Sequence, residues 1–416
     1  MKKVIISLLV AGAALAANAQ DKALLETLVK KGMLTQQEAA QIAKESVAVT
    51  PAAKSTKSIK IFGGAQGWYS WGKNSLKAGS SQNWSDGQTS GFTLRYVKLG
   101  VEADVGGGWT ATVVTDFGTE GESKNYLDKV VASKKIDYDY LNGTLQLGLR
   151  KTNMGYEQNM CDFSQLAIER SVATYFFTRD GGKNFGSRTV GVFWDGNIIQ
   201  VEGMYYNLAV TSGVSEGGTE NFITNAEKSS SLSFWAGMGY KNVAEIKGES
   251  LAYDFGLNFG YAPQGATYVA QKGSVWGINP YATANWRGFT VIAEYFLQQV
   301  EDYATRDDCV RTPMGANLTV AYKMDIGEWG AFEPVVRGSY VSTNGLGIHH
   351  YHQYNNGTLD RTEINQATTL YLGANWYPTQ AIKASLGYEF GYYDQGSPAV
   401  NRVYGNTVWA QFQVIF

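Results

Sequence analysis

The final stretch of the chain, from Tyr404 to Phe416, constrains the fold more than any other. Counting back from Phe416 in steps of two gives apolar residues as far as Val408, with polar residues such as Gln411 and Gln413 between them. This alternation predicts a β-strand with one face for hydrocarbon and one for water. Because the strand stops on an aromatic residue, the pattern favours a membrane barrel over a soluble sandwich. In lipid, unpaired backbone groups cost several kcal/mol each, so the barrel must close on a first strand.

The composition supports strands over membrane-spanning helices. Charged residues make up 17% of the chain, against roughly 25% in ordinary soluble domains. The 7 prolines are few, as a chain of paired strands requires. After the first 20 residues, no apolar run approaches the roughly 18 residues that a spanning helix needs. The formal net charge of −2 shows no basic excess, so no nucleic-acid partner is expected.

The first residues have the pattern of a secretory signal peptide. Lys2 and Lys3 precede the apolar run Val4–Ala16, and Ala17-Asn18-Ala19 is a small-x-small cleavage site. We therefore expect a signal peptide over residues 1–19 and a mature chain that begins at Gln20. An exported chain with many amphipathic strands predicts the bacterial outer membrane as its location.

Residues 20–57 are expected to form a helical hairpin and a linker. Thr35 followed by Glu38 is a capping box that opens the second helix, and the linker is rich in Thr, Ala, Ser and Lys around Pro51. Two interpretations stay open: a periplasmic hairpin that assists assembly or binds a partner, or a solvated leader before the barrel.

Residues 58–416 are predicted to form an all-β fold, a transmembrane antiparallel up-and-down β-barrel of about 16 strands. The expected strands are Ser58–Gly72, Gly91–Val105, Trp109–Gly118, Lys134–Leu141, Thr144–Lys151, Arg188–Asp195, Ile198–Leu208, Ser231–Lys241, Ser250–Tyr261, Ser274–Trp286, Phe289–Val300, Met314–Met324, Ala331–Ser342, Thr368–Tyr377, Ala381–Tyr392 and Val403–Phe416.

Short turns alternate with long polar connections, as in outer-membrane barrels. The expected short turns are Gly106-Gly107-Gly108, Asn142-Gly143, Asp195-Gly196-Asn197, Arg287-Gly288 and Pro378-Thr379. An even number of strands places both ends of the chain on the periplasmic side. Pro280 and Pro334 fall inside expected strands, where the missing N–H predicts bulges or displaced boundaries.

Several short motifs resemble one family of outer-membrane proteins. Leu94–Glu102 is similar to that family's basic second strand, and Leu147–Lys151 leads into Asn153–Glu157 as its strand does before the constriction loop. Ile168–Ser171 and Ser187–Val192 continue the likeness. These motifs resemble the phosphate-selective porins O and P in the form found in Bacteroidetes. Asn153 departs from the family, which usually has Pro at this position.

The resemblance implies a homotrimeric porin of sixteen strands whose third outside loop, here Thr152–Ser187, folds into the lumen and constricts it. The chain would then be an outer-membrane porin, a water-filled channel for the passive diffusion of ions and small hydrophilic solutes. Basic and acidic candidates for the lumen nearly balance, which favours a general pore over a strongly phosphate-selective one. The residues expected at the constriction or in the lumen are Arg95, Lys98, Arg150, Lys151, Glu169, Arg170, Arg337, Lys383 and Glu389.

A second function class is a surface adhesin or partner-binding barrel with little conductance, because the outside loops are rich in Tyr and Asn. No G-x-S-x-G, P-loop or HExxH motif supports an enzyme, and no cofactor is expected. Other expected partners are outer-membrane lipid and lipopolysaccharide, and the barrel-insertion machinery, which would read Phe416.

Cysteine and histidine positions give two further hypotheses. Cys161 and Cys309 fall in the third and sixth expected outside loops, where they could form a disulfide or remain two free thiols. His349, His350 and His352 cluster in one expected outside loop. An exposed loop with no nearby Cys or ordered carboxylate is a poor metal site, so no metal is expected there.

Overall fold

The computed structural model describes residues 58–73, 88–118, 127–139, 141–178, 185, 188–212, 232–263, 274–302, 309–344, 365–394 and 403–416. The expected signal peptide at 1–19 and the helical segment at 20–57 lie outside the described residues and stay predictions. None of the described helices is long and apolar enough to span a membrane.

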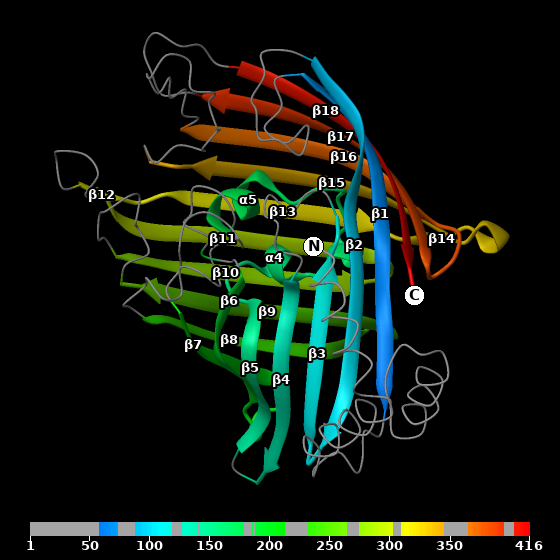
Figure 1. Ribbon diagram of the computed structural model, residues 1–416. Coiled ribbons are helices and arrows are strands. Elements are labelled where there is room, and N and C mark those ends of the chain that lie inside the picture. The colour runs from blue at the N-terminus through cyan, green and yellow to red at the C-terminus, as the bar shows by residue number, and fades with distance from the viewer. Residues whose placement is uncertain are drawn as a thin grey trace, which may run out of the picture. The chain divides into compact units, whose positions relative to one another are not determined.

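The described strands form one antiparallel sheet that closes on itself (Figure 1). The strands are β1 (Ile59–Lys73), β2 (Gln88–Gly106), β3 (Trp109–Asp116), β4 (Leu127–Tyr138), β5 (Leu141–Lys151), β6 (Arg188–Asn197), β7 (Met204–Ser212), β8 (Leu232–Ile246), β9 (Glu249–Ala262), β10 (Val275–Trp286), β11 (Phe289–Asp302), β12 (Cys309–Arg311), β13 (Met314–Tyr322), β14 (Met324–Asp325), β15 (Ala331–Ser342), β16 (Gln366–Tyr377), β17 (Ile382–Asp394) and β18 (Val403–Ile415).

Two of these strands are short continuations of a third. β12 pairs with β11 in the same register as β13 does, and β14 pairs with β15 in the same register as β13 does. β12, β13 and β14 are therefore one barrel strand, and the closed barrel has 16, as the sequence predicts.

The barrel closes where its last strand meets its first. β18 pairs with β1 from Ile415 opposite Gly64 to Asn406 opposite Lys73, and on its other side it pairs with β17. Phe416 and Gly63 exchange two backbone hydrogen bonds of 3.0 Å. The partners expected for the final strand are thus confirmed, and the sheet has no open edge at this seam.

The two faces of the wall have opposite chemistry. On β18, Phe412 and Val414 are 57% and 39% exposed, whereas the alternate residues Gln411 and Gln413 are 6% and 4% exposed. The same alternation recurs round the barrel, with apolar side chains outside and polar ones inside. This distribution of apolar and polar side chains is the reverse of that in a soluble protein, and it suits a barrel surrounded by hydrocarbon.

The connection after β5 fills part of the interior. We call residues 152–178 the inner segment; it contains α4 (Tyr156–Asn159), the 3₁₀ turn η1 (Asp162–Ser164) and α5 (Val172–Thr178). Phe176 and Phe177 of α5 are 0% and 1% exposed and pack with Phe296 of β11. Ala167 and other apolar residues of the inner segment pack against the wall in the same way. The protein core therefore lies between the inner segment and the wall.

Some expected boundaries differ from the structure, mostly in β4 to β7. β4 begins at Leu127 instead of Lys134, and β7 begins at Met204 instead of Ile198. The residue pairs Asn142-Gly143 and Gly196-Asn197 were expected in turns but lie inside β5 and β6, opposite each other. The Asn197 side chain donates to that of Asn142 at 3.0 Å, so a cross-strand amide bond holds these turn-forming residue types in the sheet.

The prolines inside strands cause neither bulges nor displaced ends. Pro280 pairs with Leu257 of β9, while the ladder to β11 is interrupted there and resumes in the same register. Pro334 pairs with Ala374 of β16 and faces the gap between β13 and β14 on its other side. In both cases the missing N–H falls on the interrupted side of the strand, so only local ladder bonds are lost.

Candidate functional site

The inner segment is held by polar side chains from a continuous part of the barrel wall. We call β10 to β18 with β1 and β2 the covered wall, because inward-facing residues of these strands bind the inner segment. The residues of the covered wall that form hydrogen bonds with it are Gln66, Arg95, Tyr96, Lys98, Asn279, Glu294, Asn317, Arg337, Ser339, Tyr371, Asn375, Lys383 and Gln413.

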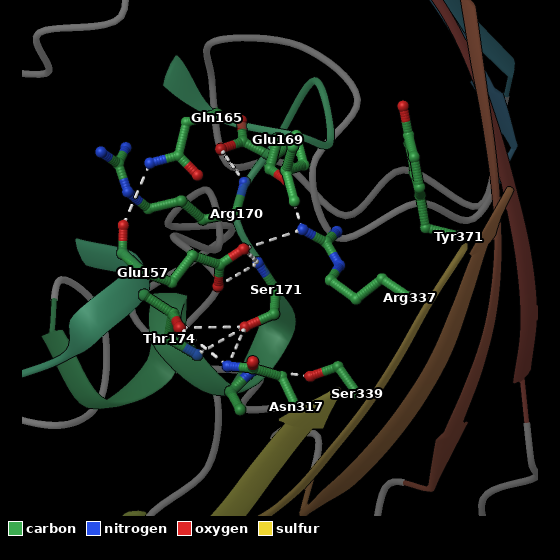
Figure 2. Close-up of polar contacts among 12 residues, drawn as sticks. Glu157, Gln165, Glu169, Arg170, Ser171, Thr174, Asn317, Arg337, Ser339 and Tyr371 are labelled. Carbon is green, nitrogen blue, oxygen red and sulfur yellow. Dashed lines mark hydrogen bonds and ion pairs between the residues drawn. The ribbon is translucent and has the colours of Figure 1, made fainter. Parts of the chain in front are cut away.

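Arg337 of β15 is the most deeply buried of the cations among these residues, with 0% exposure. Its guanidinium donates to Glu157 Oε1 at 3.0 Å, to the backbone oxygen of Glu169 at 2.5 Å and to Glu389 Oε2 at 2.9 Å. Figure 2 shows it reaching from the wall to the carboxylate of Glu157, with Tyr371 beside it. One cation on β15 thus joins two parts of the inner segment to a carboxylate of β17, the next strand but one.

A carboxylate of the wall binds the beginning of α4. Glu294 of β11 accepts hydrogen bonds from the backbone N–H groups of Tyr156 and Glu157. Asn279 and Asn317 donate to the same carboxylate at 3.0 Å and 3.1 Å. The first N–H groups of a helix have no partner within the helix, so the carboxyl oxygens of Glu294 cap α4 and fix where it lies.

Asp162 is the centre of a second charged cluster. Its carboxylate pairs with Lys98 of β2 and with Arg170, and its Oδ1 lies 3.8 Å from the ammonium of Lys151. Burial by itself would raise the pKa of Asp162, but Lys151, Lys98 and Arg170 outweigh burial and hold that pKa well below its usual range. The Asp162 side chain is therefore a firmly ionised anchor.

Glu157 is ionised for a similar reason. Burial opposes the charge on its carboxylate, but the guanidinium of Arg337 and hydrogen bonds from Ser171 and Thr174 hold the pKa of Glu157 below its usual range. The backbone N–H of Ser171 donates to both carboxylate oxygens, at 3.0 Å and 3.2 Å. This contact links α4 to the start of α5.

Two further expected residues also bind the inner segment. The guanidinium of Arg95 contacts Glu169 at 2.7 Å and lies 4.5 Å from the centroid of the Trp68 ring. The Lys383 ammonium donates to the backbone oxygen of Gln165 at 2.9 Å. Of the nine charged residues expected in the lumen, the structure therefore brings eight into the interface between the inner segment and the wall; these are Arg95, Lys98, Lys151, Glu169, Arg170, Arg337, Lys383 and Glu389.

Arg150 belongs to a different environment. It pairs with Asp195 of β6 at 2.5 Å, and its side chain is 15% exposed while that of Asp195 is 40% exposed. It also donates to Asn153 at 2.9 Å, so the side chain of Asn153 is bound to the strand that it follows. We call β3 to β9 the open wall. Lys151 of β5 and an apolar cluster on β6 to β8 contact the inner segment, but inward-facing residues such as Lys241 and Asp254 keep part of their surface exposed.

The sequence reasoning missed part of the anionic side of this interface. Glu157 and Asp162 of the inner segment were not among the expected site residues, and Glu294 of β11 was expected only as one of the acidic residues that face the lumen. Each is at most 6% exposed and binds several donors. A signal for them did exist, since an ionised side chain is rarely buried without a partner. The three carboxylates of residues 152–178, against the one basic residue Arg170, could have pointed to the basic residues of the wall.

Of the two cysteines, Cys161 carries a free, exposed thiol. The structure therefore agrees with the free-thiol alternative at this residue. His349, His350 and His352 lie outside the described residues.

Known proteins match part of this chain by sequence and most of it by fold. Residues 270–416 match the family described as phosphate-selective porin O and P. A comparison with curated proteins finds no match.

Solved structures match the whole barrel at low sequence identity. OprB of Pseudomonas putida has a TM-score of 0.59 at 13% identity, over 86% of this chain and 94% of that chain. The outer membrane channel DcaP of Acinetobacter baumannii has a TM-score of 0.53 at 12% identity, over 86% and 97% of the two chains. OmpF of Salmonella typhi, in complex with daunomycin, has a TM-score of 0.51 at 14% identity over the same shares. Residues 270–416 are thus similar in sequence to the phosphate-selective porin O and P family, and the barrel as a whole has the fold of these outer-membrane channels.

Proposed function

We propose that this chain forms a water-filled channel in the bacterial outer membrane, through which ions and small hydrophilic solutes diffuse passively. The observation that carries the proposal is the difference between the two walls. The inner segment is bound to the covered wall by buried charges, while the inward-facing charged residues Asp195, Lys241 and Asp254 of the open wall keep part of their surface exposed. Solutes would pass between the inner segment and the open wall.

The inner segment, together with the rest of residues 152–187, would act as the constriction. Its contacts reach strands on distant parts of the covered wall, from Asn279 in β10 to Gln66 in β1. A segment fixed at this many points narrows the lumen by a constant amount. In this assignment, the eight charged residues of the interface set the position of the constriction, and Arg150 with Asp195 faces the solute.

We propose that both ends of the chain are periplasmic, because a secreted amino-terminal segment and an even strand count require it. Phe416 lies next to the short turn between β16 and β17, since Ile415 donates to the backbone oxygen of Ala381. The short turns would then face the periplasm. Lipopolysaccharide around the barrel, insertion machinery that reads Phe416 and a homotrimeric assembly belong to the same proposal.

Planar-bilayer recording tests the channel. The purified full-length chain should give discrete steps of current in potassium chloride, and reversal potentials in a salt gradient should show weak ion selectivity. Added neutral polymers of increasing size should stop reducing the current once they are too large to enter, which measures the constriction. A folded, heat-modifiable barrel that carries no current would contradict the proposal and favour the adhesin.

A further inference from the structure

Two tyrosines from different strands lie flat against the barrel wall. Tyr205 of β7 crosses Gly239 of β8, and Tyr281 of β10 crosses Gly256 of β9; a Cβ atom on either glycine would collide with the phenol ring above it. The two hydroxyls are hydrogen-bonded to each other, and that of Tyr205 also donates to Asp254 Oδ1 at 2.6 Å. Both rings are therefore held in place before any ligand arrives, which lowers the entropic cost of binding.

A third ring comes from the inner segment. Tyr156 of α4 lies beside Tyr281, with ring centroids 4.9 Å apart and planes inclined by 30°. We call Tyr156, Tyr205 and Tyr281 the tyrosine platform. All three side chains are half-buried, unlike the sealed Arg337. The platform therefore lies where the inner segment passes the wall, and part of its surface stays accessible.

The polar groups around the platform carry little net charge. Lys241 of β8 is the cross-strand partner of Asp254, so one accessible charge of each sign borders the rings, while Glu294, which accepts from the Tyr156 N–H, is buried. Further along the same strands, Asn207 and Asn258 flank Gly237. Asn207 Oδ1 is buried and has no hydrogen-bond partner among the residues that the structure describes. The platform thus combines aromatic surface with donors and acceptors of both kinds.

We propose that the tyrosine platform binds saccharides as they pass through the channel; the inference rests on the channel function proposed above. A pyranose ring has an apolar face of C–H groups that packs on an aromatic ring, and a rim of hydroxyls that bond to amides and carboxylates. Small anions are disfavoured, because the faces of the rings are negative and Asp254 adds a negative charge. A small cation would favour a ring face, but the Lys241 ammonium already lies 5.4 Å from the centroid of Tyr205.

Current block by maltotriose tests the inference on the full-length channel. Maltotriose should reduce the ion current in a saturable manner. Tyr205→Ala and Tyr281→Ala should each raise the half-blocking concentration by roughly 3- to 10-fold, the loss of one aromatic contact. Tyr340→Ala is the matched control, because Tyr340 is 36% exposed on the outer face of β15 and should leave the value unchanged.

The outcomes separate this inference from the channel proposal. A normal conductance with no saturable block, or a block that both tyrosine variants leave unchanged, would overturn the saccharide site alone. Saturable block by tetramethylammonium chloride and none by maltotriose would overturn it in favour of a cation site. If the barrel carries no current, calorimetric titration of maltotriose into the protein in detergent tests the platform directly. The same binding heat for the native protein and for Tyr281→Ala, or no binding heat for either, would overturn the saccharide site.

Discussion

The covered and open walls are built from the same kind of strand, yet they use charge differently. On the covered wall, Arg337 and Glu294 are at most 3% exposed, and each binds several groups of the inner segment. On the open wall, Asp195 is 40% exposed and Lys241 is exposed as well. Inward direction alone therefore does not make a charged residue part of the solute path. The predictions below test whether the covered wall holds the inner segment while the open wall faces the solute.

Loss of Arg337 should have the largest effect. Removal of one partner of a buried ion pair costs about 3–5 kcal/mol, and Arg337→Ala leaves Glu157 and Glu389 without this cation. The equilibrium between the anchored and released inner segment should move by on the order of 100-fold or more, so single-channel conductance should rise and residues 152–178 should become sensitive to protease.

Arg287→Ala is the control for that experiment. Arg287 pairs with Glu249 on the surface, where the two side chains are 48% and 49% exposed, so its loss should change neither readout. An Arg337→Ala channel with the conductance and protease resistance of the native protein would show that the buried charges do not hold the inner segment.

Loss of a positive charge should affect ion selectivity more on the open wall than on the covered wall. Lys241→Gln removes an exposed charge on the proposed path, so it should shift the reversal potential in a salt gradient towards cation preference, by about a twofold change in permeability ratio. Lys383→Gln, on the covered wall, is the counterpart and should shift it much less. Equal shifts for the two variants would remove the distinction between the walls.

Acid should release the inner segment while the barrel stays folded. The pKa values of Asp162 and Glu157 are held below their usual range, so these carboxylates stabilise the anchored state above about pH 4, and that stability is lost as the pH falls through their values in the folded protein. Conductance should therefore rise progressively below about pH 4. A conductance that stays flat down to about pH 2 would contradict this assignment.

The smallest expected effect concerns Cys161. Its thiol is free and exposed, so a charged methanethiosulfonate added to the channel should react with it and lower the current by a modest fraction. Cys161→Ser should abolish this change. If the native protein reacts with the methanethiosulfonate only after treatment with a reductant, the result would instead support a disulfide between Cys161 and Cys309.

Most of the barrel could be predicted from the sequence, because a strand between lipid and water must alternate. One instance of this alternation is the buried Gln413 between the exposed residues Val414 and Phe412. The closure of β18 with β1 follows from the need to leave no open edge. Asn142 and Gly143 could not be placed, since their residue types favour turns and only the cross-strand partner Asn197 holds them in β5.

The site was harder to predict because residue type does not report burial. Lys98 and Arg150 are both basic, and both precede the inner segment in the sequence. Lys98 is buried against Asp162, whereas Arg150 pairs with the exposed Asp195. The difference arises from where the inner segment lies in three dimensions. Its anchors, such as Glu157 to Arg337, join residues 180 positions apart, a separation that no local pattern encodes.

Barrel closure sets an order of events during folding. Gln413 of the last strand donates to Phe163 of the inner segment across 250 positions, and β1 pairs with a strand that ends at Ile415. The inner segment therefore cannot form most of its contacts until nearly the whole chain is present. Contacts this distant in sequence form slowly and leave apolar strands open to aggregation. A chain of this design depends on being kept unfolded until the last strand is present, and the pairing of β1 with β18 then encloses the inner segment while its last anchors form.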